Sequence, residues 1–469
     1  MPAPAHPLGP GDEIDGFVIG EQVHSGRMGT VCRVTAKAPR PQIDFPLLMK
    51  LPRTGRGSGG EGLLAFETEL SILPVLSGRH VPRFVAAGDL ARTPYLVVEW
   101  IEGRSLEELL KGAPVKPEIA ARYGAAVADA LHSLHGQGGR HLDLKPENVI
   151  VRASGEAVLI DFGMAHHAQV PDLLAEEKRF ASGSAPYVSP EQVQGERSDS
   201  RSDLFALGVM LYEMVSGELP FGSPQTLAGL RDRLWRAPVP LRARFPEIPG
   251  WYQEIVLRCL EPAREKRYQS AAHVAFDLRH PEQVPLTQRG RQVRPAGLLE
   301  QGRRWWHARP SPLAQPRAAR PLNAPLVMVA VDTMHPDDAR HGAIRRATAQ
   351  FLSASADFRL VCVSVVHGEP VGASEEQPGI HLEHWVRLRH WIEPLDISAG
   401  RLSLHVIESL HPSAALLGFA RSNNVDLIVI GAPGPNQQAL AWWRSVASAV
   451  SANAPCSVYV VRLGEEAGG

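Results

Sequence analysis

The order of strand-like and helix-like segments changes across residues 281–323, and this change limits the folds that are open to the chain. Residues 13–100 hold short β-rich runs separated by turn signals, with one helical stretch at 61–76. Residues 105–280 carry mainly the helical period. From residue 325, five continuous apolar runs alternate with helical segments, a pattern typical of a parallel sheet that is buried on both faces. We therefore expect two folded domains of different class within the 469 residues.

The domain boundaries follow from these changes in pattern. We expect a disordered N-terminus (1–15), a bilobal α+β domain (16–280, with lobes 16–100 and 101–280), a Pro/Arg-rich linker (281–323), an α/β doubly wound domain with a five-stranded parallel sheet (324–463) and a tail (464–469). The linker has no sustained period, so we expect it to be extended.

Composition limits the partners and the compartment. The 49 basic and 50 acidic residues nearly cancel, so no overall field attracts nucleic acid or an anionic membrane. We find no apolar run long enough to cross a bilayer and no secretory signal at the N-terminus. The four cysteines are far apart and form no CxxC pair, which argues against a zinc site or a disulfide framework. We expect a cytoplasmic protein that binds neither nucleic acid nor membrane.

Two segments of the strand-rich region suggest contacts with phosphate. In "VHSGRMGTV", Gly26 and Gly29 allow a close approach of the backbone to a ligand, although two glycines in a hairpin are weak evidence alone. Lys50 ends an apolar run, in a chain that has seven lysines and 42 arginines. A compact ammonium group suits a site that holds a phosphate and a carboxylate together. A lysine kept at this position therefore indicates chemistry more than surface charge.

The carboxylate for Lys50 is expected on the helix that follows. Phe66 and Leu70 mark the buried face of this helix. At 3.6 residues per turn, Glu69 lies about 60° from Phe66, and Glu67 lies about 100° away in the other direction. Glu69 is thus closer to the inner face, and we predict that it pairs with Lys50.

Two further segments bring acidic and amide groups together. "HLDLKPEN" contains Asp143, Lys145 and Asn148, and "VLIDFG" contains Asp161 at the end of an apolar strand. Residues 149–160 are predicted to form a hairpin, which returns Asp161 to the side of Asn148. Magnesium needs only one or two protein oxygen ligands when phosphate supplies the others. The sequence therefore predicts a magnesium–phosphate site here.

The order and separation of these motifs resemble the eukaryotic-like, bacterial-type serine/threonine protein kinases. The resemblance covers residues 16–280 and includes "SPE" at 189–191. It implies a bilobal protein kinase fold, with ATP and Mg²⁺ (or Mn²⁺) as cofactors and Ser/Thr hydroxyls of proteins as acceptors.

The resemblance also implies roles for single residues, with Asp143 accepting or orienting the hydroxyl proton and Lys145 neutralising the γ-phosphate. The expected ATP-binding residues are Val23, Gly26, Gly29, Val31, Lys50, Glu69, Val98, Glu99 and Ile101; the expected metal ligands are Asn148 and Asp161; and the expected supports of the substrate-binding segment are Ser184, Glu191, Asp203 and Arg267.

The chain departs from the family pattern in two places. His24 replaces the first glycine of the glycine loop, which we expect to weaken nucleotide affinity without abolishing it. Leu142 replaces the arginine that binds a phosphate on the activation segment. That segment, residues 164–188, contains no Thr, and its first hydroxyl belongs to Ser182. We therefore predict that activity does not depend on phosphorylation of this segment.

Residues 324–463 resemble the universal stress protein family. Asp332, Gly431, Gly434 and Ser445 stand at positions that contact ATP in the ATP-binding members, but Arg444 replaces the third glycine of their phosphate loop. Two interpretations stay open, a second nucleotide site and a structural role that includes formation of a homodimer.

These features favour a protein kinase with a regulatory or oligomerising C-terminal domain. A catalytically weak pseudokinase that acts as a nucleotide-sensing scaffold is the alternative, although a scaffold would need none of the chemistry-bearing residues. A small-molecule kinase fits less well, because "SGSAPYVSPE" and "SDLFALG" resemble the peptide-binding apparatus of protein kinases.

Overall fold

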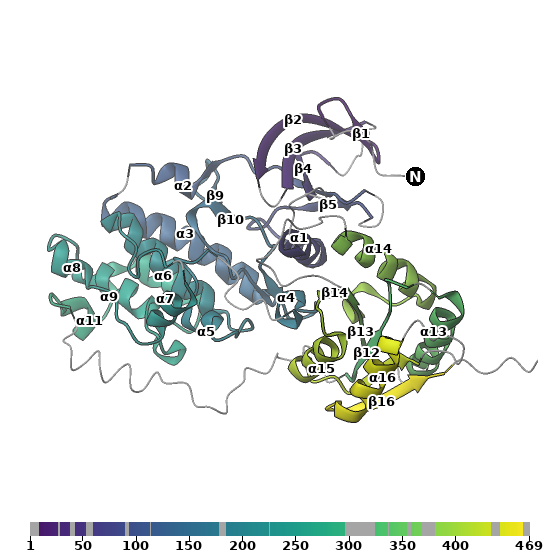
Figure 1. Ribbon diagram of the computed structural model, residues 1–469. Helices are drawn as coiled ribbons and strands as arrows, with labels where there is room; N and C mark the ends of the chain where they lie inside the picture. Colours follow the sequence, from purple (N-terminus) through teal and green to yellow (C-terminus); the bar gives the residue numbers. More distant parts are fainter. Residues whose placement is uncertain are drawn as a thin grey trace, which may run out of the picture.

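Two folded domains lie side by side in the computed structural model (Figure 1). The structure describes residues 9–26, 29–37, 43–52, 60–89, 93–112, 114–177, 184–224, 226–295, 324–335, 337–353, 358–366, 380–432 and 441–462. Among these residues, no helix combines the length and the apolar character that crossing a bilayer requires.

The N-lobe is a six-stranded sheet with one helix beside it (Figure 1). Its strands are β1 (Glu13–Ile14), β2 (Phe17–Gly26), β3 (Gly29–Ala36), β4 (Leu47–Pro52), β5 (Phe84–Ala87) and β6 (Leu96–Glu99), in the order β1-β2-β3-β4-β6-β5. All neighbouring strands are antiparallel. Helix α1 (Gly60–Ile72) continues into η1 (Leu73–Val75). Alternation of buried and exposed residues along β3 matches the period of two expected for a sheet with one buried face.

The C-lobe is mainly helical. Its helices are α2 (Leu106–Leu109), α3 (Pro117–Gly136), α4 (Leu173–Glu176), α5 (Pro190–Val193), α6 (Arg201–Ser216), α7 (Leu227–Arg231), α8 (Leu241–Arg244), α9 (Gly250–Cys259), α10 (Ala271–Arg279) and α11 (Gln288–Arg291). Its short strands are β7 (Arg104–Ser105), β8 (Gly139–Arg140), β9 (Val149–Val151), β10 (Ala157–Leu159) and β11 (His166–His167), and its 3-10 turns are η2 (Pro146–Asn148), η3 (Asp232–Leu234), η4 (Arg264–Lys266) and η5 (Pro281–Gln283).

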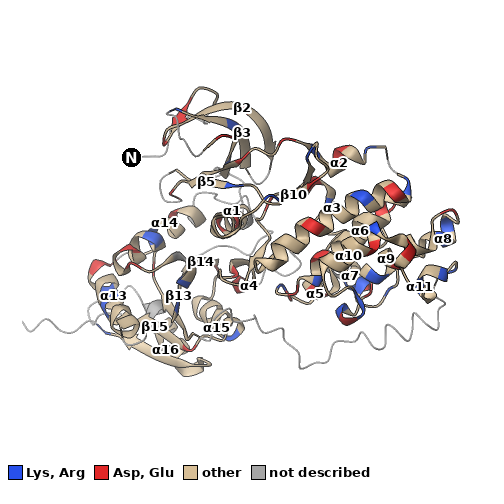
Figure 2. Cartoon of the chain, turned by 180° about the vertical axis from the view of Figure 1, so that it is seen from behind, with Lys and Arg blue, Asp and Glu red and all other residues tan. Residues whose placement is uncertain are grey.

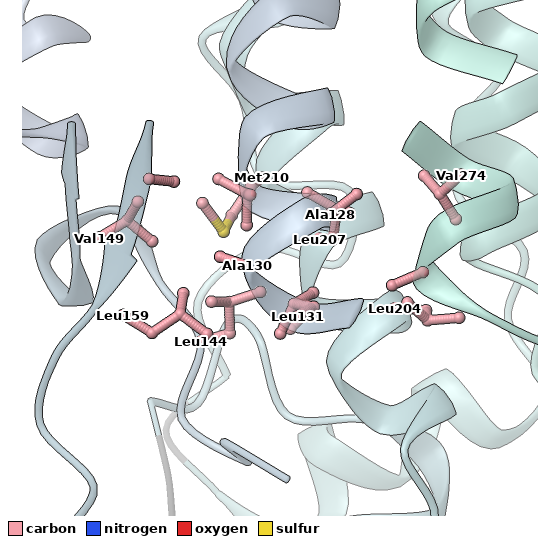
Figure 3. Packing of buried hydrophobic residues seen from close by; sticks show 14 of the residues in the cluster. Ala128, Ala130, Leu131, Leu144, Val149, Leu159, Leu204, Leu207, Met210 and Val274 are labelled. Carbon is pink, nitrogen blue, oxygen red and sulfur yellow. The ribbon is translucent and has the colours of Figure 1, made fainter. Parts of the chain in front are cut away.

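One hydrophobic core joins the two lobes and supports the site. Figure 3 shows Met210 of α6 beside Val149 of β9, and Leu144 between Leu159 of β10 and Leu131 of α3. The same core includes Phe66 of α1. The expected hairpin at 149–160 is therefore present, and a rigid helical base holds it.

Part of the segment predicted as linker belongs to the C-lobe. Residues 281–295 include η5 and α11, and α11 packs on α9. The buried Glu254 carboxylate accepts hydrogen bonds from the backbone amides of Thr287 (2.9 Å) and Gly290 (2.8 Å), and Arg289 forms an ion pair with it at 3.2 Å. These polar contacts hold a segment that has no hydrophobic period, which is why sequence periodicity missed it. Residues 296–323 lie outside the described part of the chain.

The C-terminal domain is a five-stranded parallel sheet with helices on both faces, so the expected fold class is confirmed for both domains. The strands are β12 (Leu326–Ala330), β13 (Arg359–Val366), β14 (Leu402–Glu408), β15 (Leu427–Gly431) and β16 (Ser457–Val461), in the order β14-β13-β12-β15-β16. The helices are α13 (Asp338–Ser353), α14 (Ile380–Ile392), α15 (Pro412–Asn423) and α16 (Ala441–Asn453), with 3-10 turns η6 (Glu393–Leu395) and η7 (Ala399–Arg401). Helices α13 and α14 cover one face of the sheet, and α15 and α16 cover the other.

The C-terminal domain contacts helices α1 and α4 of the first domain. Helix α14 lies against α1, and α15 lies against α4, where β14 is also close (Figures 1 and 2). Helices α1 and α4 also pack on each other. The C-terminal domain therefore meets both the helix that carries Glu69 and the segment that follows Asp161.

Candidate active site

The predicted ion pair between strand β4 and helix α1 is present. Lys50 Nζ lies 2.5 Å from Glu69 Oε1, and the Glu69 side chain is buried. Burial lowers the pKa of Lys50, but the charges of Glu69 and Asp161 act more strongly in the other direction and the net pKa is raised. Lys50 therefore carries a full positive charge inside the molecule. Glu67, the carboxylate not chosen from the sequence, lies on α1 near the C-terminal domain.

Asp161 lies close to this pair. The Phe162 amide donates to Glu69 Oε1 at 3.3 Å, which ties the segment after Asp161 to α1. Burial raises the pKa of Asp161, but the charges of Lys50, His141 and Lys145 outweigh this effect and the net pKa is lowered. The carboxylate is thus ionised at neutral pH and suited to a metal cation. Its backbone is left-handed, with a φ of 66°.

Residues 141–148, which we call the catalytic loop, place Asp143 beside Lys145. Asp143 Oδ2 lies 3.8 Å from Lys145 Nζ, and Asp143 Oδ1 accepts a hydrogen bond of 2.6 Å from the Ser184 amide. Burial raises the pKa of Asp143, while Lys145 and the Ser184 amide act in the opposite direction. A carboxylate with a raised pKa is a better proton acceptor, which suits general-base chemistry.

Asn148 is held between Asp143 and the strand that leads to Asp161. Its Nδ2 donates to the Asp143 carbonyl at 2.8 Å, and its own carbonyl accepts from the Ile160 amide at 3.0 Å. These bonds place Asn148, directly before β9, close to Asp161, which follows the paired strand β10. Since Asn148 uses its nitrogen for Asp143, its Oδ1 is the atom left for a cation.

Two buried sets of hydrogen bonds support the site: one holds the catalytic loop, and the other holds Glu191. Asp203 accepts from the His141 amide (3.0 Å), and its second oxygen accepts from the Leu142 amide (2.8 Å). Arg267 donates two bonds to Glu191, at 2.6 and 2.8 Å. Planar, two-pronged pairs of this kind fix orientation as well as distance. Asp203, Glu191 and Arg267 are three of the residues that the resemblance implied as supports of the substrate-binding segment.

The Leu142 side chain is buried. Tyr187, Val188 and Ala206 lie near it, together with the polar residues Gln192 and Ser202. The Leu142 φ of 60° is unusual for a branched residue, and the Asp203 carboxylate and the Gln192 side chain hold its amide and carbonyl in that conformation. A leucine packed in this way offers no donor to a phosphate.

A cavity of about 200 Å³ opens between the two lobes. It is lined by His24, Gly26, Gly29, Thr30, Val31, Lys50, Leu51, Gly62, Ala65, Phe66, Glu69, Asp161 and Gly163. Gly29 has a φ of 147°, and a Cβ there would lie 2.2 Å from the Leu51 carbonyl, so only glycine lets β3 approach β4 this closely. The His24 imidazole lies over Gly26. A Cβ added to Gly26 would lie 2.7 Å from Nε2 of His24. The histidine therefore narrows the cavity at the glycine loop.

Four of the residues expected to bind ATP do not line this cavity. The cavity lies beside the residues that are expected to contact the phosphates of ATP. The four residues outside it are Val23, Val98, Glu99 and Ile101. Val23 is exposed on β2, and Val98 is buried in the core. The Glu99 side chain pairs with Arg83 (3.0 Å) and Arg152 (2.8 Å). Its carboxylate therefore stabilises the connection between the lobes, and only its backbone remains for a ligand.

His141 is a site residue to which the sequence analysis gave no role. Its ring packs on Phe162, with centroids 5.2 Å apart, and its Nε2 contacts the Ile160 carbonyl at 3.0 Å. In the sequence, its position directly before Leu142 and Asp143 in "HLD" indicates that it belongs to the site. His141 thus links the catalytic loop to Ile160, the residue directly before Asp161.

The second predicted pocket is only partly described. Asp332 follows β12, and its Oδ1 accepts from the amides of Met334 (3.0 Å) and His335 (3.1 Å). A Cβ on Gly431 would lie 2.9 Å from Ile344 of α13, so this glycine serves close packing of helix on strand. Gly434 lies outside the described residues, as do the side chains of Arg444 and Ser445. Asp332 and Gly431 stand at the ends of neighbouring strands, where strand order reverses and such sheets bind ligands.

Comparison with known protein families gives two matches. Residues 17–277 match the protein kinase domain, and residues 326–462 match the universal stress protein family. The first match covers more than half of the chain.

Several curated relatives are similar to the first domain. The serine/threonine-protein kinase pkn2 of Myxococcus xanthus is 35% identical over 217 residues, 45% of this chain and 26% of that protein. A probable serine/threonine-protein kinase of Clostridium perfringens is 31% identical over 214 residues, 45% of this chain and 31% of that protein. PknB of Mycobacterium tuberculosis is 32% identical over 186 residues, 39% of this chain and 30% of that protein. The chain thus spans less than a third of the length of each of these three relatives.

Proposed function

Because the chain belongs to the protein kinase family, we propose that it transfers the γ-phosphate of ATP to Ser and Thr hydroxyls of proteins. The observation that carries this proposal is the convergence of Asp143, Lys145, Asn148 and Asp161 beside the intact Lys50–Glu69 pair. The curated relatives are named as serine/threonine kinases. The Ser184 amide on Asp143 and the Glu191–Arg267 pair belong to the apparatus that would hold a peptide.

The residues present fit magnesium and a nucleotide phosphate. The described residues contain no cluster of three or more His, Cys, Asp or Glu side chains that could enclose a metal alone. The ionised Asp161 and the Asn148 oxygen are the sparse oxygen set that Mg²⁺ uses together with phosphate. Bound magnesium would neutralise charge on the phosphates. Lys50 would orient the α- and β-phosphates, Lys145 would contact the γ-phosphate, and Asp143 would accept or orient the proton of the acceptor hydroxyl.

The deciding experiment uses γ-labelled ATP, Mg²⁺ and a generic basic protein as acceptor. The wild-type chain is expected to transfer label, and Asp143→Asn is expected to lower the rate by a factor of about 10²–10⁴, the usual contribution of a positioned acid–base group. Asp129→Asn is the matched control, since Asp129 forms an exposed ion pair with Arg279 on the C-lobe. Absence of transfer by the wild type would instead favour the nucleotide-sensing scaffold.

We also propose that this activity does not require phosphorylation of the activation segment (residues 164–188). The Leu142 side chain is buried and carries no hydrogen-bond donor, where the family has a phosphate-binding arginine. Ser182, the first hydroxyl of the segment, lies outside the described residues. The proposal therefore rests on Leu142 and on the sequence of the segment.

A further inference from the structure

The C-terminal domain holds two glutamates of the activation segment in a buried polar site. Glu176 and Glu177 lie at the end of α4. Glu176 forms an ion pair with Arg359 of β13, and its second oxygen lies 2.7 Å from Nε2 of His405 on β14. Nδ1 of the same histidine lies 3.1 Å from Glu177 Oε1. In the sequence, Glu176 is therefore 183 positions from Arg359 and 229 positions from His405.

This site is built from buried groups. The His405 side chain is fully buried, and Glu176, Arg359 and Asn423 are each less than 9% exposed. Asn423 Nδ2, at the end of α15, donates to the Glu176 carbonyl at 3.2 Å. His405 Nδ1 and Nε2 both face carboxylates, so the ring donates at both nitrogens in its protonated form. Burying a carboxylate is costly unless it is paired and hydrogen-bonded, and here the partners come from the other domain.

The place of the site in the sheet explains why α4 fits there. Arg359, Ser403 and His405 lie on the sheet face that α15 and α16 cover elsewhere, and β14 is the edge strand on that side. Helix α4 lies beside β14 and α15 (Figure 2). A helix of the first domain thus completes the cover of the C-terminal sheet.

The other side of α4 packs on α1. Leu173 and Leu174 form a hydrophobic cluster with Leu64 of α1 and Met164. Leu64 lies on the same helix as Glu69, which pairs with Lys50. A continuous set of packed contacts therefore runs from His405 through α4 and α1 to the ion pair in the candidate active site.

The C-terminal domain also contacts α1 directly. Trp385 of α14 is buried, and its indole lies beside the Glu67 carboxyl. Burial raises the pKa of Glu67 to about 8, while His405 and Arg389 act to lower it. Glu67 therefore faces the C-terminal domain, and Glu69, two residues later, faces the nucleotide cavity.

We propose that Arg359, His405 and Asn423 form a binding site for the Glu176–Glu177 end of the activation segment, and that docking there holds α4 and α1 in the catalytically competent position. The ligand class is a helix end that carries adjacent carboxylates. In this chain, carboxylates bound by the C-terminal domain take the ordering role that a phosphorylated residue and an arginine have in other kinases. These are positioning residues, because none of them contacts the nucleotide cavity.

The test uses the full chain and a double-mutant cycle of Glu176→Gln and His405→Asn. The first readout is backbone amide exchange of α1 and α4 without nucleotide. We expect each single variant to increase the amide-exchange rate in both helices. The exchange rate of the double variant should be close to that of the single variants, because the two side chains act as one unit. Additive effects, or exchange that stays at the wild-type level, would overturn the proposal.

The second readout is kcat/KM on a peptide substrate, which rests on the proposed kinase function. We expect a loss of about tenfold in each single variant, the scale of one charge-assisted hydrogen bond. An unchanged or increased rate would refute the activating role of docking. An inactive wild-type chain would refute the proposed function alone, because the exchange readout does not need catalysis.

Two further variants control for local damage. His411→Asn changes an exposed histidine of the same domain and is expected to match the wild type in both readouts. Arg359→Lys keeps the charge but loses the planar donor fork, so we expect an intermediate effect. If Arg359→Lys were as damaging as His405→Asn while the exchange of β12 and β13 also increased, the residues would be structural and the proposal would fail.

Discussion

Two buried carboxylates, Glu176 within the activation segment and Glu191 just after it, are held by different parts of the molecule. Glu191 pairs with Arg267, whose side chain is fully buried in the same lobe. Glu176 pairs with Arg359 and His405, which belong to the other domain. The first pair is present whenever the C-lobe is folded. The second pair exists only while the domains are docked, so it is the one that a signal could alter.

Removal of Arg267 should have the largest effect. Arg267→Met leaves Glu191 buried without its charged partner and removes the donor to three backbone carbonyls. Breaking a buried pair in this way costs about 3–5 kcal/mol in the free energy of unfolding. Denaturant unfolding of the full chain, followed in the transition of the first domain, measures this loss. Arg279→Met removes an exposed pair with Asp129 and should cost about 1 kcal/mol or less. Equal losses of stability in the two variants would contradict the distinction between a buried and an exposed ion pair.

The pair between the domains should weaken at alkaline pH. Burial lowers the pKa of His405, but the hydrogen bonds and charges of Glu176 and Glu177 outweigh it and raise the pKa to about 10. The contribution of His405 to docking is thus complete below its ordinary pKa near 6.5 and is lost as the pH rises through about 10. Burial raises the pKa of Glu176, but His405 and Arg359 lower it to about 2, so its contribution is complete above pH 4.5 and is lost as the pH falls through about 2.

Ionisation of Glu67 also weakens docking as the pH rises, but over a lower pH range than the loss of the His405 proton. The raised pKa of Glu67 means that the docked state disfavours its ionised form, so stability falls as the pH rises from about 4.5 to 8. We expect amide exchange in α4, corrected for the intrinsic effect of pH, to rise between pH 7 and 10 relative to exchange in α6. His405→Asn should flatten most of this dependence. A wild-type profile with no slope would show that His405 does not hold the domains together.

Phosphatase treatment should have the smallest effect. If carboxylates of α4 order the activation segment, the dephosphorylated chain should keep kcat/KM within about twofold of the untreated chain. The assay compares both preparations on one peptide, with mass spectrometry to verify removal of phosphate. A collapse of the rate would mean that a phosphate orders the segment despite Leu142, and the contrast between the two carboxylates would lose its functional meaning.

The chemistry of the first domain could be read from the sequence because its signals are local. Asp143, Lys145 and Asn148 lie within one loop, and the hairpin after them brings Asp161 back by its length alone. Helical periodicity was sufficient to choose Glu69 over Glu67, because the two residues differ only in direction on α1. The short α11, in contrast, is held by hydrogen bonds to Glu254 and has no apolar period that could reveal it.

The sequence by itself determined the two fold classes, the helices and strands that carry the motifs, and the groups gathered around the nucleotide cavity. It did so because hydrophobic period and motif spacing act over short stretches of chain. Only the tertiary structure decided where the C-terminal domain sits and that Glu176 meets His405 across 229 positions. No local pattern encodes such a contact, since it depends on two separately folded surfaces that each leave a charge needing a partner. Leu142 predicts from the sequence that phosphate-dependent control is absent, and the packing of α4 between the two domains supports the proposal that docking takes its place.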